Sequence, residues 1–221
     1  MSEYTFHSSE WNPGQAEPPF WSYRRAGKRA LDLTLVLLFL PIVLLVILLL
    51  AAMVARDGGN PFYSQMRVGR GGRQFRFWKL RTMVADADAA LARHLETNPQ
   101  AAREWAETQK LRHDPRITAT GHFLRASSLD ELPQLFNVLT GDMTLVGPRP
   151  MMPSQRELYP GRDYFDLQPG LTGLWQVSAR NESTFAARAM FDDTYNAEMS
   201  LALDLKILAQ TVIVVLRRTG I

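Results

Sequence analysis

The sequence contains no cysteine and only four histidines in 221 residues. The lack of cysteine excludes disulfide bonds, thiolate catalysis and zinc sites with cysteine ligands. The histidines, at positions 7, 94, 113 and 122, are scattered and show no metal-ligand spacing. The sequence also lacks a phosphate-binding P-loop, a dinucleotide-binding glycine fingerprint and the nucleophile elbow of α/β-hydrolases.

The chain has only a weak bias towards one sign of charge. Lys and Arg number 25 against 22 Asp and Glu, which gives a net charge of +3. This modest basic excess suits an anionic partner, but it does not distinguish a nucleotide from a phospholipid or a nucleic acid. Charged residues make up 21% of the chain, too many for a polytopic membrane protein, and 46% hydrophobic residues suffice for a core and one membrane segment.

A long apolar run lies near the N-terminus. Residues 1–22 carry prolines among polar residues and predict a flexible tail. Residues 33–54 contain no charged side chain, and as a helix they would measure about 33 Å. The hydrocarbon core of a bilayer is about 30 Å thick. Residues 23–56 are therefore predicted to anchor the chain in a membrane, with the main domain in residues 57–221.

Two membrane geometries remain open for this run. Pro41 lies inside it and favours a kink. Basic residues flank both ends, namely Arg24, Arg25, Lys28 and Arg29 before the run and Arg56, Arg67, Arg70 and Arg73 after it. Lys and Arg favour the cytoplasmic side of a membrane, so basic flanks at both ends favour a re-entrant hairpin. A kinked simple span is about equally compatible with the pattern.

The remainder of the chain predicts a small, mainly helical α+β domain with a short β-hairpin. The predicted elements are strands over 61–65 and 74–78 around a glycine turn, and helices over 86–112 with a break near Pro99, over 129–139 and over 192–216. From residue 201 onwards the last helix is apolar on most of its surface, which suits either a membrane interface or a packed core.

Six cations and no acid occupy the region of the predicted hairpin. They are Arg67, Arg70, Arg73, Arg76, Lys79 and Arg81. Alternate residues of a strand share a face, so Lys79 and Arg81 are predicted to project together. Since aromatic residues surround these two, a phosphate site and a charged surface are about equally favoured. For the first four arginines, the pattern favours a solvated surface beside a membrane.

Two adjacent carboxylates, Asp130 and Glu131, follow Arg125 by five and six residues. Ser128 and Glu131 spell a capping box, which would be an ordinary structural role. However, if Ser128 capped the helix, Pro133 would remove one of its early hydrogen bonds. A helix that begins later avoids this cost and frees both acids from capping.

Arg149 lies between Pro148 and Pro150. Flanking prolines restrict the backbone, which lowers the entropy lost on ligand binding and orients the guanidinium in advance. A rigid loop with a surface arginine explains the pattern equally well.

Seven segments, taken in order, resemble the bacterial sugar transferases, also called monotopic polyprenyl-phosphate phosphoglycosyl transferases. They are the apolar run with Pro41 and residues 28–32 (KRALD), 77–83 (FWKLRTM), 114–118 (DPRIT), 128–135 (SLDELPQL), 141–150 (GDMTLVGPRP) and 169–177 (PGLTGLWQV). The resemblance covers residues 26–218. One difference lies in the membrane helix, where the family has a Ser-Pro pair and this chain has Leu40 before the proline.

The resemblance implies transfer of a hexose-1-phosphate from a UDP-sugar to undecaprenyl phosphate, with release of UMP, as the initiating step of exopolysaccharide synthesis. Segments 98–105 and 180–182 are similar to family members that transfer galactose or glucose. The implied location is the bacterial inner membrane, with a cytoplasmic catalytic domain over 57–221. A nucleic-acid partner is not expected, because the cations cluster at a glycine turn and no basic reading helix is present.

The resemblance also implies roles for individual residues. Asp130 corresponds to the family's nucleophile, which forms a covalent aspartyl-phosphosugar intermediate, and Glu131 is its partner carboxylate. Magnesium prefers carboxylate and phosphate oxygens, so Asp130 or Glu131 is the expected Mg²⁺ ligand. The expected phosphate-binding residues are Arg125 first, then Arg149, and less strongly Lys79 and Arg81.

Overall fold

The computed structural model describes residues 22–108, 111–178 and 184–216. The predicted tail, apart from Ser22, and the segment 180–182 lie outside these ranges. The helices and strands are α1 (Lys28–Ala55), β1 (Phe62–Val68), β2 (Gln74–Leu80), α2 (Ala87–Thr97), α3 (Pro99–Thr108), α4 (Ala119–Ser127), α5 (Gln134–Thr140), β3 (Thr144–Val146), β4 (Gly170–Thr172), α6 (Leu174–Ser178), α7 (Arg188–Glu198) and α8 (Leu201–Leu216). The predicted α+β, mainly helical fold with one long apolar N-terminal helix is confirmed.

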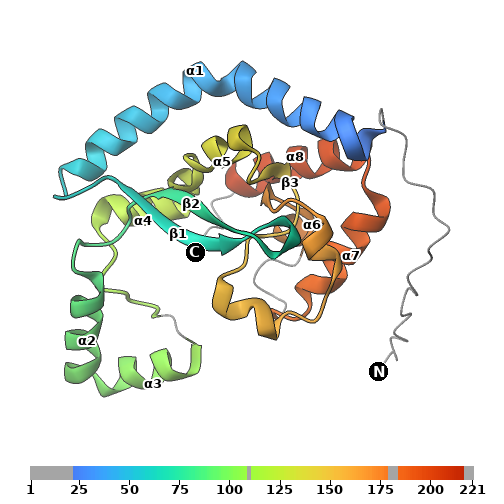
Figure 1. Ribbon diagram of the computed structural model, residues 1–221. Coiled ribbons are helices and arrows are strands. Elements are labelled where there is room, and N and C mark those ends of the chain that lie inside the picture. The colour runs from blue at the N-terminus through green and yellow to red at the C-terminus, as the bar shows by residue number, and fades with distance from the viewer. Residues whose placement is uncertain (1–21, 109–110, 179–183, 217–221) are drawn as a thin grey trace.

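Helix α1 arches over the body of the protein, with a bend near its middle and both ends close to the body (Figure 1). Pro41 lies in the middle of α1, where its missing N–H removes a helix hydrogen bond and favours a kink. The buried residues of α1 fall in two groups, Lys28, Asp32 and Val36 near its start and Ile47, Leu50, Ala51 and Val54 near its end. Between the two groups, Leu38 is 65% exposed and Ile42 66%. The helix is therefore buried against the body most fully near its two ends and is more exposed in its middle.

Strands β1 and β2 form the predicted antiparallel hairpin, and each strand is longer than predicted. The register pairs Phe62 with Leu80 and Val68 with Gln74. The turn places Gly71 and Gly72 at positive φ, a conformation that glycine adopts without a steric cost. Phe75 of β2 is buried in the main core, which α1, α5, β3, α7 and α8 also line.

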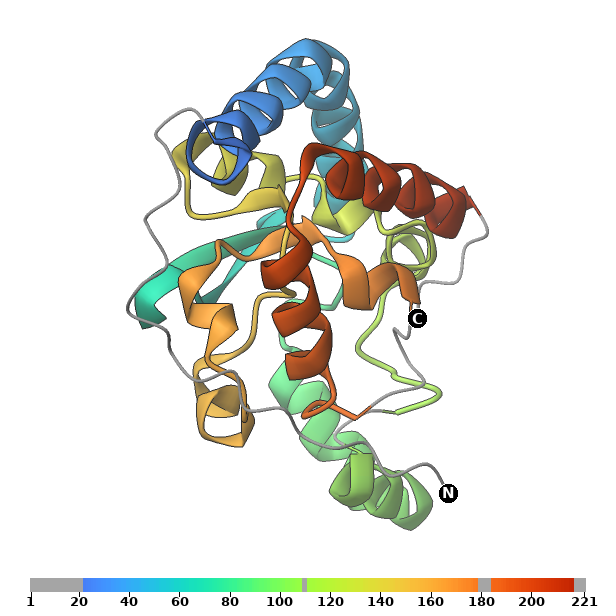
Figure 2. The same cartoon turned by 90° about the vertical axis from the view of Figure 1, so that its right-hand side faces the viewer.

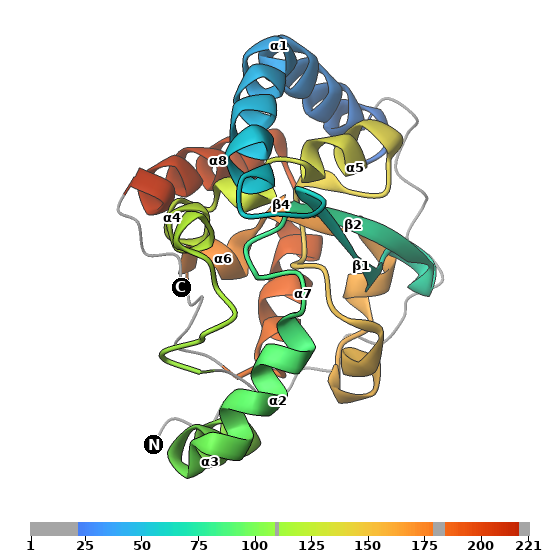
Figure 3. The same ribbon diagram turned by 90° about the vertical axis from the view of Figure 1, so that its left-hand side faces the viewer.

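The predicted helix over 86–112 is found as α2 and α3, which are separated at Asn98 as predicted, but α3 ends at Thr108 and residues 111–112 are not helical. Residues 109–110 lie outside the described ranges. The two helices project from the body at the end opposite α1 (Figure 3).

The single helix predicted over 192–216 is wrong, because α7 ends at Glu198 and α8 begins at Leu201. The break has a local cause. The Oγ of Ser200 accepts a hydrogen bond from the backbone N–H of Leu203 at 3.3 Å, which is the interaction that caps a helix N-terminus.

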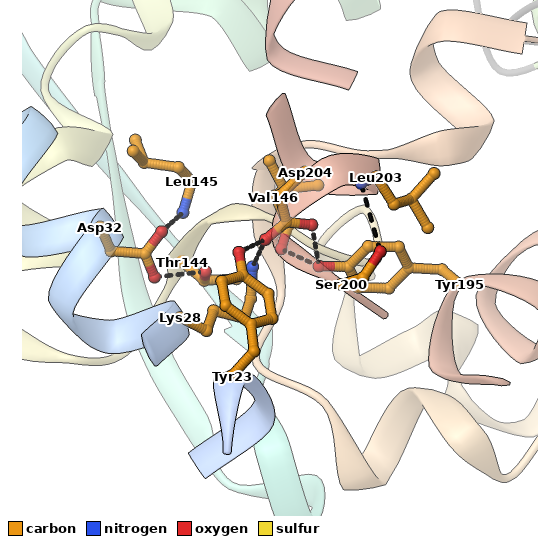
Figure 4. Close-up of polar contacts among 10 residues, drawn as sticks. All are labelled: Tyr23, Lys28, Asp32, Thr144, Leu145, Val146, Tyr195, Ser200, Leu203 and Asp204. Carbon is orange, nitrogen blue, oxygen red and sulfur yellow. Dashed lines mark hydrogen bonds and ion pairs between the residues drawn. The ribbon is translucent and has the colours of Figure 1, made fainter. Parts of the chain in front are cut away.

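A buried polar cluster fastens the start of α1 to α7 and α8 (Figure 4). Its centre is Asp204 of α8, whose side chain has no exposed surface. Asp204 accepts hydrogen bonds from Lys28 Nζ at 2.7 Å, from the hydroxyl of Tyr195 at 2.7 Å, and from the hydroxyl of Tyr23. Lys28, one of the basic residues that precede the apolar run, is therefore buried inside the protein and bonded to Asp204.

A second buried carboxylate, Asp32, fastens α1 to β3 (Figure 4). It accepts hydrogen bonds from Thr144 Oγ1 at 2.5 Å and from the backbone N–H of Leu145 at 3.1 Å. Nearby, Arg29 donates to the carbonyls of Val138 and Leu139 at the end of α5. The first turns of α1 are thus held by three different elements of the domain.

Replacing Lys28 by Met should destabilise the protein, because it leaves Asp204 buried without its only salt-bridge partner among the described residues. Removing one member of a buried ion pair typically costs about 3 kcal/mol or more. The free energy of unfolding in detergent should fall by that amount. Arg56→Met, which removes an exposed cation just beyond the other end of α1, should change it by less than about 0.5 kcal/mol. Equal effects of the two substitutions would contradict this account of the cluster.

Candidate functional site

All six residues predicted for the site line one pocket of about 810 Å³. It lies between the hairpin, residues 81–89, α4 and the loop that follows β3. The predicted residues around it are Lys79, Arg81, Arg125, Asp130, Glu131 and Arg149. The structure therefore brings together side chains that are up to 70 positions apart, 79 to 149, in the chain.

The two carboxylates are placed by a sharp turn after α4. Within the described ranges, Ser128 is the one residue other than glycine with a positive φ, at 55°. It ends α4, and Asp130 and Glu131 follow in a single 3₁₀ turn (Leu129–Glu131). Ser128 makes no side-chain capping bond, so the capping-box alternative is wrong. Helix α5 begins at Gln134, directly after Pro133, as the cost of an internal proline predicted.

Lys79 bridges the two carboxylates. Its Nζ lies 3.2 Å from Asp130 Oδ2 and 2.8 Å from Glu131 Oε1. The strand that carries Lys79 is docked by Asn137 of α5, which donates to the carbonyl of Arg76 at 2.7 Å and accepts from the backbone N–H of Trp78 at 3.2 Å. These bonds hold β2 beside the turn that carries both acids.

Asp130 is the more deeply buried of the two acids, with 8% of its side chain exposed against 21% for Glu131. Burial raises the pKa of the Asp130 carboxyl, the charge of Lys79 opposes that rise, and the charge of Glu131 adds to it. Arg125 also favours the ionised form. The protonation state of Asp130 therefore depends on the cations around it.

Arg125 is held in place by Thr82. Its Nε donates to Thr82 Oγ1 at 2.9 Å, its one hydrogen bond in the part of the chain that the structure describes. The close approach of α4 to this segment requires Gly121, where a Cβ would lie 2.0 Å from the carbonyl oxygen of Thr82. Among the described residues only the Nε of the guanidinium has a hydrogen-bond partner, so its two Nη groups can bind an anion.

Arg81 joins the pocket to the end of α1. It lies one residue beyond β2, and its Nη2 donates to the carbonyl of Val54, in the last turn of α1, at 3.2 Å. Lys79 and Arg81 line the same pocket, so the predicted common face is confirmed. A cation at the C-terminal end of a helix is also favoured by the helix dipole.

Arg149 is positioned by the parallel pairing of β3 with β4. The two strands approach so closely that a Cβ on Gly170 would lie 2.1 Å from the backbone nitrogen of Gly147. A side chain at position 170 would therefore push β4 away from the loop that carries Arg149, so this position requires glycine. The Nη2 of Arg149 lies 3.8 Å from Glu131 Oε1.

Arg67, which the sequence assigned to a solvated surface, also lines the pocket, so that prediction is wrong. Its Nη2 donates to Gln65 Oε1 at 2.9 Å, and its guanidinium lies 5.2 Å from the Phe77 ring centre. The register of the hairpin puts Arg67 on the same face as Lys79. The alternation of side chains along the two strands would have predicted this shared face if the register had been known. The other three arginines of that group, Arg70, Arg73 and Arg76, are exposed as predicted.

Asp130 and Glu131 are the candidate ligands for a magnesium ion in this pocket. Within the described residues no group of three or more Asp, Glu, His or Cys could hold a metal. Magnesium is commonly bound by one or two carboxylates together with substrate phosphates. Asp130 and Glu131 offer oxygen donors of this kind at the wall of a pocket, so they fit such an ion when a phosphate ligand is also present.

Helices α1 (blue) and α8 (dark red) lie on one side of the molecule (Figure 2). On α8, Asp204 and Ile207 are buried, whereas Leu205, Val212 and Ile213 are 48%, 59% and 49% exposed. One face of α8 therefore packs into the core, as one of the two interpretations predicted, and these apolar side chains of its other face are left exposed. The span Tyr23–Ala55 is long and apolar enough to cross a membrane, by length and composition.

Together these features define a domain with an apolar anchor and a cationic pocket built around two acids. A sequence profile described as "Bacterial sugar transferase" matches residues 23–218. The chain belongs to the bacterial sugar transferase family.

Several curated proteins are similar to the chain. A "UDP-galactose-lipid carrier transferase" of Erwinia amylovora is 48% identical over 195 residues, 87% of this chain and 41% of that protein. "Exopolysaccharide production protein ExoY" of Rhizobium meliloti (strain 1021) is 43% identical over 192 residues, 84% of each chain. A "UDP-glucose:undecaprenyl-phosphate glucose-1-phosphate transferase" of Caulobacter vibrioides is 39% identical over 199 residues, 84% of this chain and 68% of that protein. The chain spans about two fifths of the length of some relatives, the Erwinia protein among them.

Replacing Lys79 by Met should raise the pKa of the Asp130 carboxyl, because it removes the cation that favours the ionised form. The carboxyl should then lose its proton only at a higher pH than in the wild type. A ¹³C NMR titration of labelled aspartate side chains, with the signal assigned by its loss in Asp130→Asn, measures the change. Lys79→Arg, which keeps the charge, should titrate close to the wild type. An unchanged titration in Lys79→Met would exclude Lys79 as the controlling cation.

Proposed function

We propose that the protein transfers a hexose-1-phosphate, galactose or glucose, from a UDP-sugar to undecaprenyl phosphate, and that this step initiates exopolysaccharide synthesis. The observation that carries the proposal is the buried Asp130 carboxylate, bonded to Lys79 in a pocket lined by several arginines. The names of the relatives include both UDP-galactose and UDP-glucose as donors.

A nucleophilic role suits Asp130 because its carboxylate is held beside cations that attract phosphate. In the first step a carboxylate oxygen attacks the phosphorus atom that bears the sugar. A bond to that phosphorus forms, the bond to the bridging oxygen breaks, and UMP leaves with that oxygen. In the second step a phosphate oxygen of the lipid attacks the same phosphorus, and the bond to Asp130 breaks. Dividing the transfer in this way means that the soluble donor and the membrane lipid need not be bound together.

The cations of the pocket reduce the electrostatic repulsion between the donor and Asp130. A diphosphate repels an attacking carboxylate, and fixed positive groups around the phosphate reduce that repulsion and stabilise the charge of the transition state. Arg125 is placed to bind the donor's phosphates, and Lys79 favours the ionised form of Asp130. Glu131 shares Lys79 with Asp130 and lies nearer Arg149, so it orients both cations.

We propose that Asp130 and Glu131 also bind Mg²⁺ together with the donor's phosphates. When bound, a magnesium ion neutralises part of the phosphate charge and makes the phosphorus a better electrophile. The side chains themselves supply the carboxylate oxygens and hold them within the cationic pocket.

The two anchored ends of α1 support a re-entrant membrane helix. At the start, Lys28 binds Asp204, and at the end the carbonyl of Val54 accepts from Arg81. A helix that crossed the bilayer from one face to the other would carry these two contacts to opposite sides. Because one domain makes both contacts, α1 enters and leaves by the same face. We place that face, and the catalytic domain of residues 57–221, on the cytoplasmic side of the bacterial inner membrane.

Asp130→Asn should abolish the reaction while leaving the fold intact, since Asn is similar in size but cannot act as the nucleophile. Purified protein is incubated with Mg²⁺ and a UDP-sugar labelled in the sugar, first without lipid and then with undecaprenyl phosphate. The wild type should carry label on the protein without lipid, and UMP release in Asp130→Asn should fall by at least about 10³-fold. Asp142→Asn, which changes an exposed acid outside the pocket, should behave as the wild type.

The same assay distinguishes the two-step route from direct transfer. UMP release at the full rate in Asp130→Asn would exclude the aspartate as nucleophile. Product formation without any labelled wild-type protein would instead favour a single-step transfer. Chelation with EDTA should stop labelling if the proposed magnesium site is correct.

The topology of α1 gives a separate prediction. Single cysteines placed at Ser22 and at Gly58 flank the helix on its two sides, and the protein has no cysteine of its own. In intact cells, a thiol reagent that cannot cross the inner membrane should label neither position, whereas both should react after the cells are opened. Labelling of position 22 alone in intact cells would establish a simple span.

A further inference from the structure

A second hollow lies beside the catalytic pocket and differs from it in chemistry. This acceptor groove has a volume of about 540 Å³ and runs between α1, α5, the end of β4 and α8. Most of its wall is aliphatic or aromatic, and Val36, Phe39, Leu135, Leu171, Leu208 and Val212 are representative. A nucleotide or a sugar would find few hydrogen-bond partners along this wall.

The acceptor groove and the catalytic pocket meet at three residues. Ser128, Glu131 and Arg149 line both hollows. A molecule that lies in the groove can therefore present a polar end to the cationic pocket while its apolar part stays against α1 and α8. The wall changes from apolar to charged at this junction.

Two further guanidinium groups, those of Arg67 and Arg188, interact electrostatically with Arg149 of the junction. Burial, and after it the charge of Arg149, lowers the pKa of the Arg67 guanidinium. Burial also lowers the pKa of Arg188 to about 10, with the charges of Arg149 and Arg67 adding to the effect and the charge of Asp192 opposing it. In the part of the chain that the structure describes, the Nε atoms of Arg67 and Arg188 are buried without a hydrogen-bond partner. The three guanidinium groups repel one another, and a phosphate bound at Arg149 would add to the opposing negative charge of Glu131.

We propose that the acceptor groove holds the first isoprene units of the polyprenyl acceptor, with its phosphate at Arg149. This inference rests on the proposed function, because it assigns a place to the lipid of the second step. It divides the cations between the two substrates: Arg125 and Lys79 face the donor, and Arg149 receives the acceptor. The attacking phosphate oxygen then approaches from the groove side of Asp130.

The chemistry of the junction favours a polyprenyl phosphate over a bilayer phospholipid. In a polyprenyl phosphate the charged group is attached directly to the hydrocarbon chain, which matches an apolar wall that ends at an arginine. In a phospholipid, a glycerol ester separates the phosphate from its chains and would place polar groups against the aliphatic wall, at a cost in free energy.

The size of the groove limits how much of the lipid it holds. A volume of about 540 Å³ is typical of a site for one small organic molecule, so only the proximal part of the chain fits. Phe39 and Val212 at the open side are 52% and 59% exposed. The remaining isoprene units continue past them into the membrane, along the uncovered faces of α1 and α8.

Adjacent positions on α8 allow a matched test. Val212 lines the groove and Ile213 does not, and both are about half exposed. Each is changed to Trp, and the rate of lipid-linked product is measured against the concentration of undecaprenyl phosphate in detergent micelles. For Val212→Trp, kcat/KM for the lipid should fall about tenfold, equivalent to ~1.4 kcal/mol. Ile213→Trp should stay within about twofold of the wild type, and equal effects of the two substitutions would overturn the proposal.

A direct binding measurement identifies the occupant without depending on catalysis. A polyprenyl phosphate with a photoreactive diazirine near its phosphate end is cross-linked to the wild-type protein, and the labelled peptides are mapped. Cross-links should fall on α1 and α8 around the groove, and undecaprenyl phosphate should compete while phosphatidylglycerol should not. Cross-links elsewhere, or equal competition by phosphatidylglycerol, would overturn the inference. If cross-links map to the groove but wild-type protein takes no label from the UDP-sugar without lipid, the two-step function fails and the lipid site stands.

Discussion

The buried carboxylate of Asp204 holds together the parts of the protein that we expect to meet the membrane. It fixes the start of α1 against α8 through Lys28, and it accepts a further hydrogen bond from Tyr195 of α7. Because an uncompensated charge in a protein interior is costly, α1 cannot move away from α8 without a large loss of stability. Asp32 extends the same constraint to β3, and the loop of Arg149 follows that strand directly. The width of the acceptor groove and the position of Arg149 therefore depend on two buried acids at one end of α1.

Asp204 and Asp130 show how differently a buried carboxylate can be used in one small domain. Three donors surround Asp204: an ammonium and two phenolic hydroxyls. In the part of the chain that the structure describes, Asp130 accepts a hydrogen bond only from Lys79, which it shares with Glu131. A fully bonded carboxylate is a structural joint, because its lone pairs are occupied. A carboxylate with unoccupied lone pairs beside several cations retains the capacity to bond to phosphorus or to a metal ion.

Features that depend on neighbouring residues could be predicted from the sequence. Pro99 marked the break between α2 and α3, and Pro133 marked the start of α5, since proline cannot continue a helix from an interior position. Ser200 directly precedes the apolar stretch that begins at residue 201, which is a typical position for a helix cap, but one long helix was predicted through it instead of two. Features that join distant segments could not be predicted in this way. Lys28 and Asp204 are 176 positions apart, and the assignment of Arg67 to the pocket required the register of two strands. The six site residues were recognised through resemblance and local pattern, whereas their convergence on one pocket required the fold.

The amide of Asn137 has a consequence for how this chain behaves before it is fully packed. An edge strand exposes unpaired backbone groups that can bind another chain and start aggregation, and a lone two-stranded hairpin is only marginally stable in water. By donating to the carbonyl of Arg76 and accepting from the N–H of Trp78, this one side chain takes the place of a third strand along the outer edge of β2. The protein thus closes its hairpin against intermolecular pairing with a single amide, at the strand that carries Lys79.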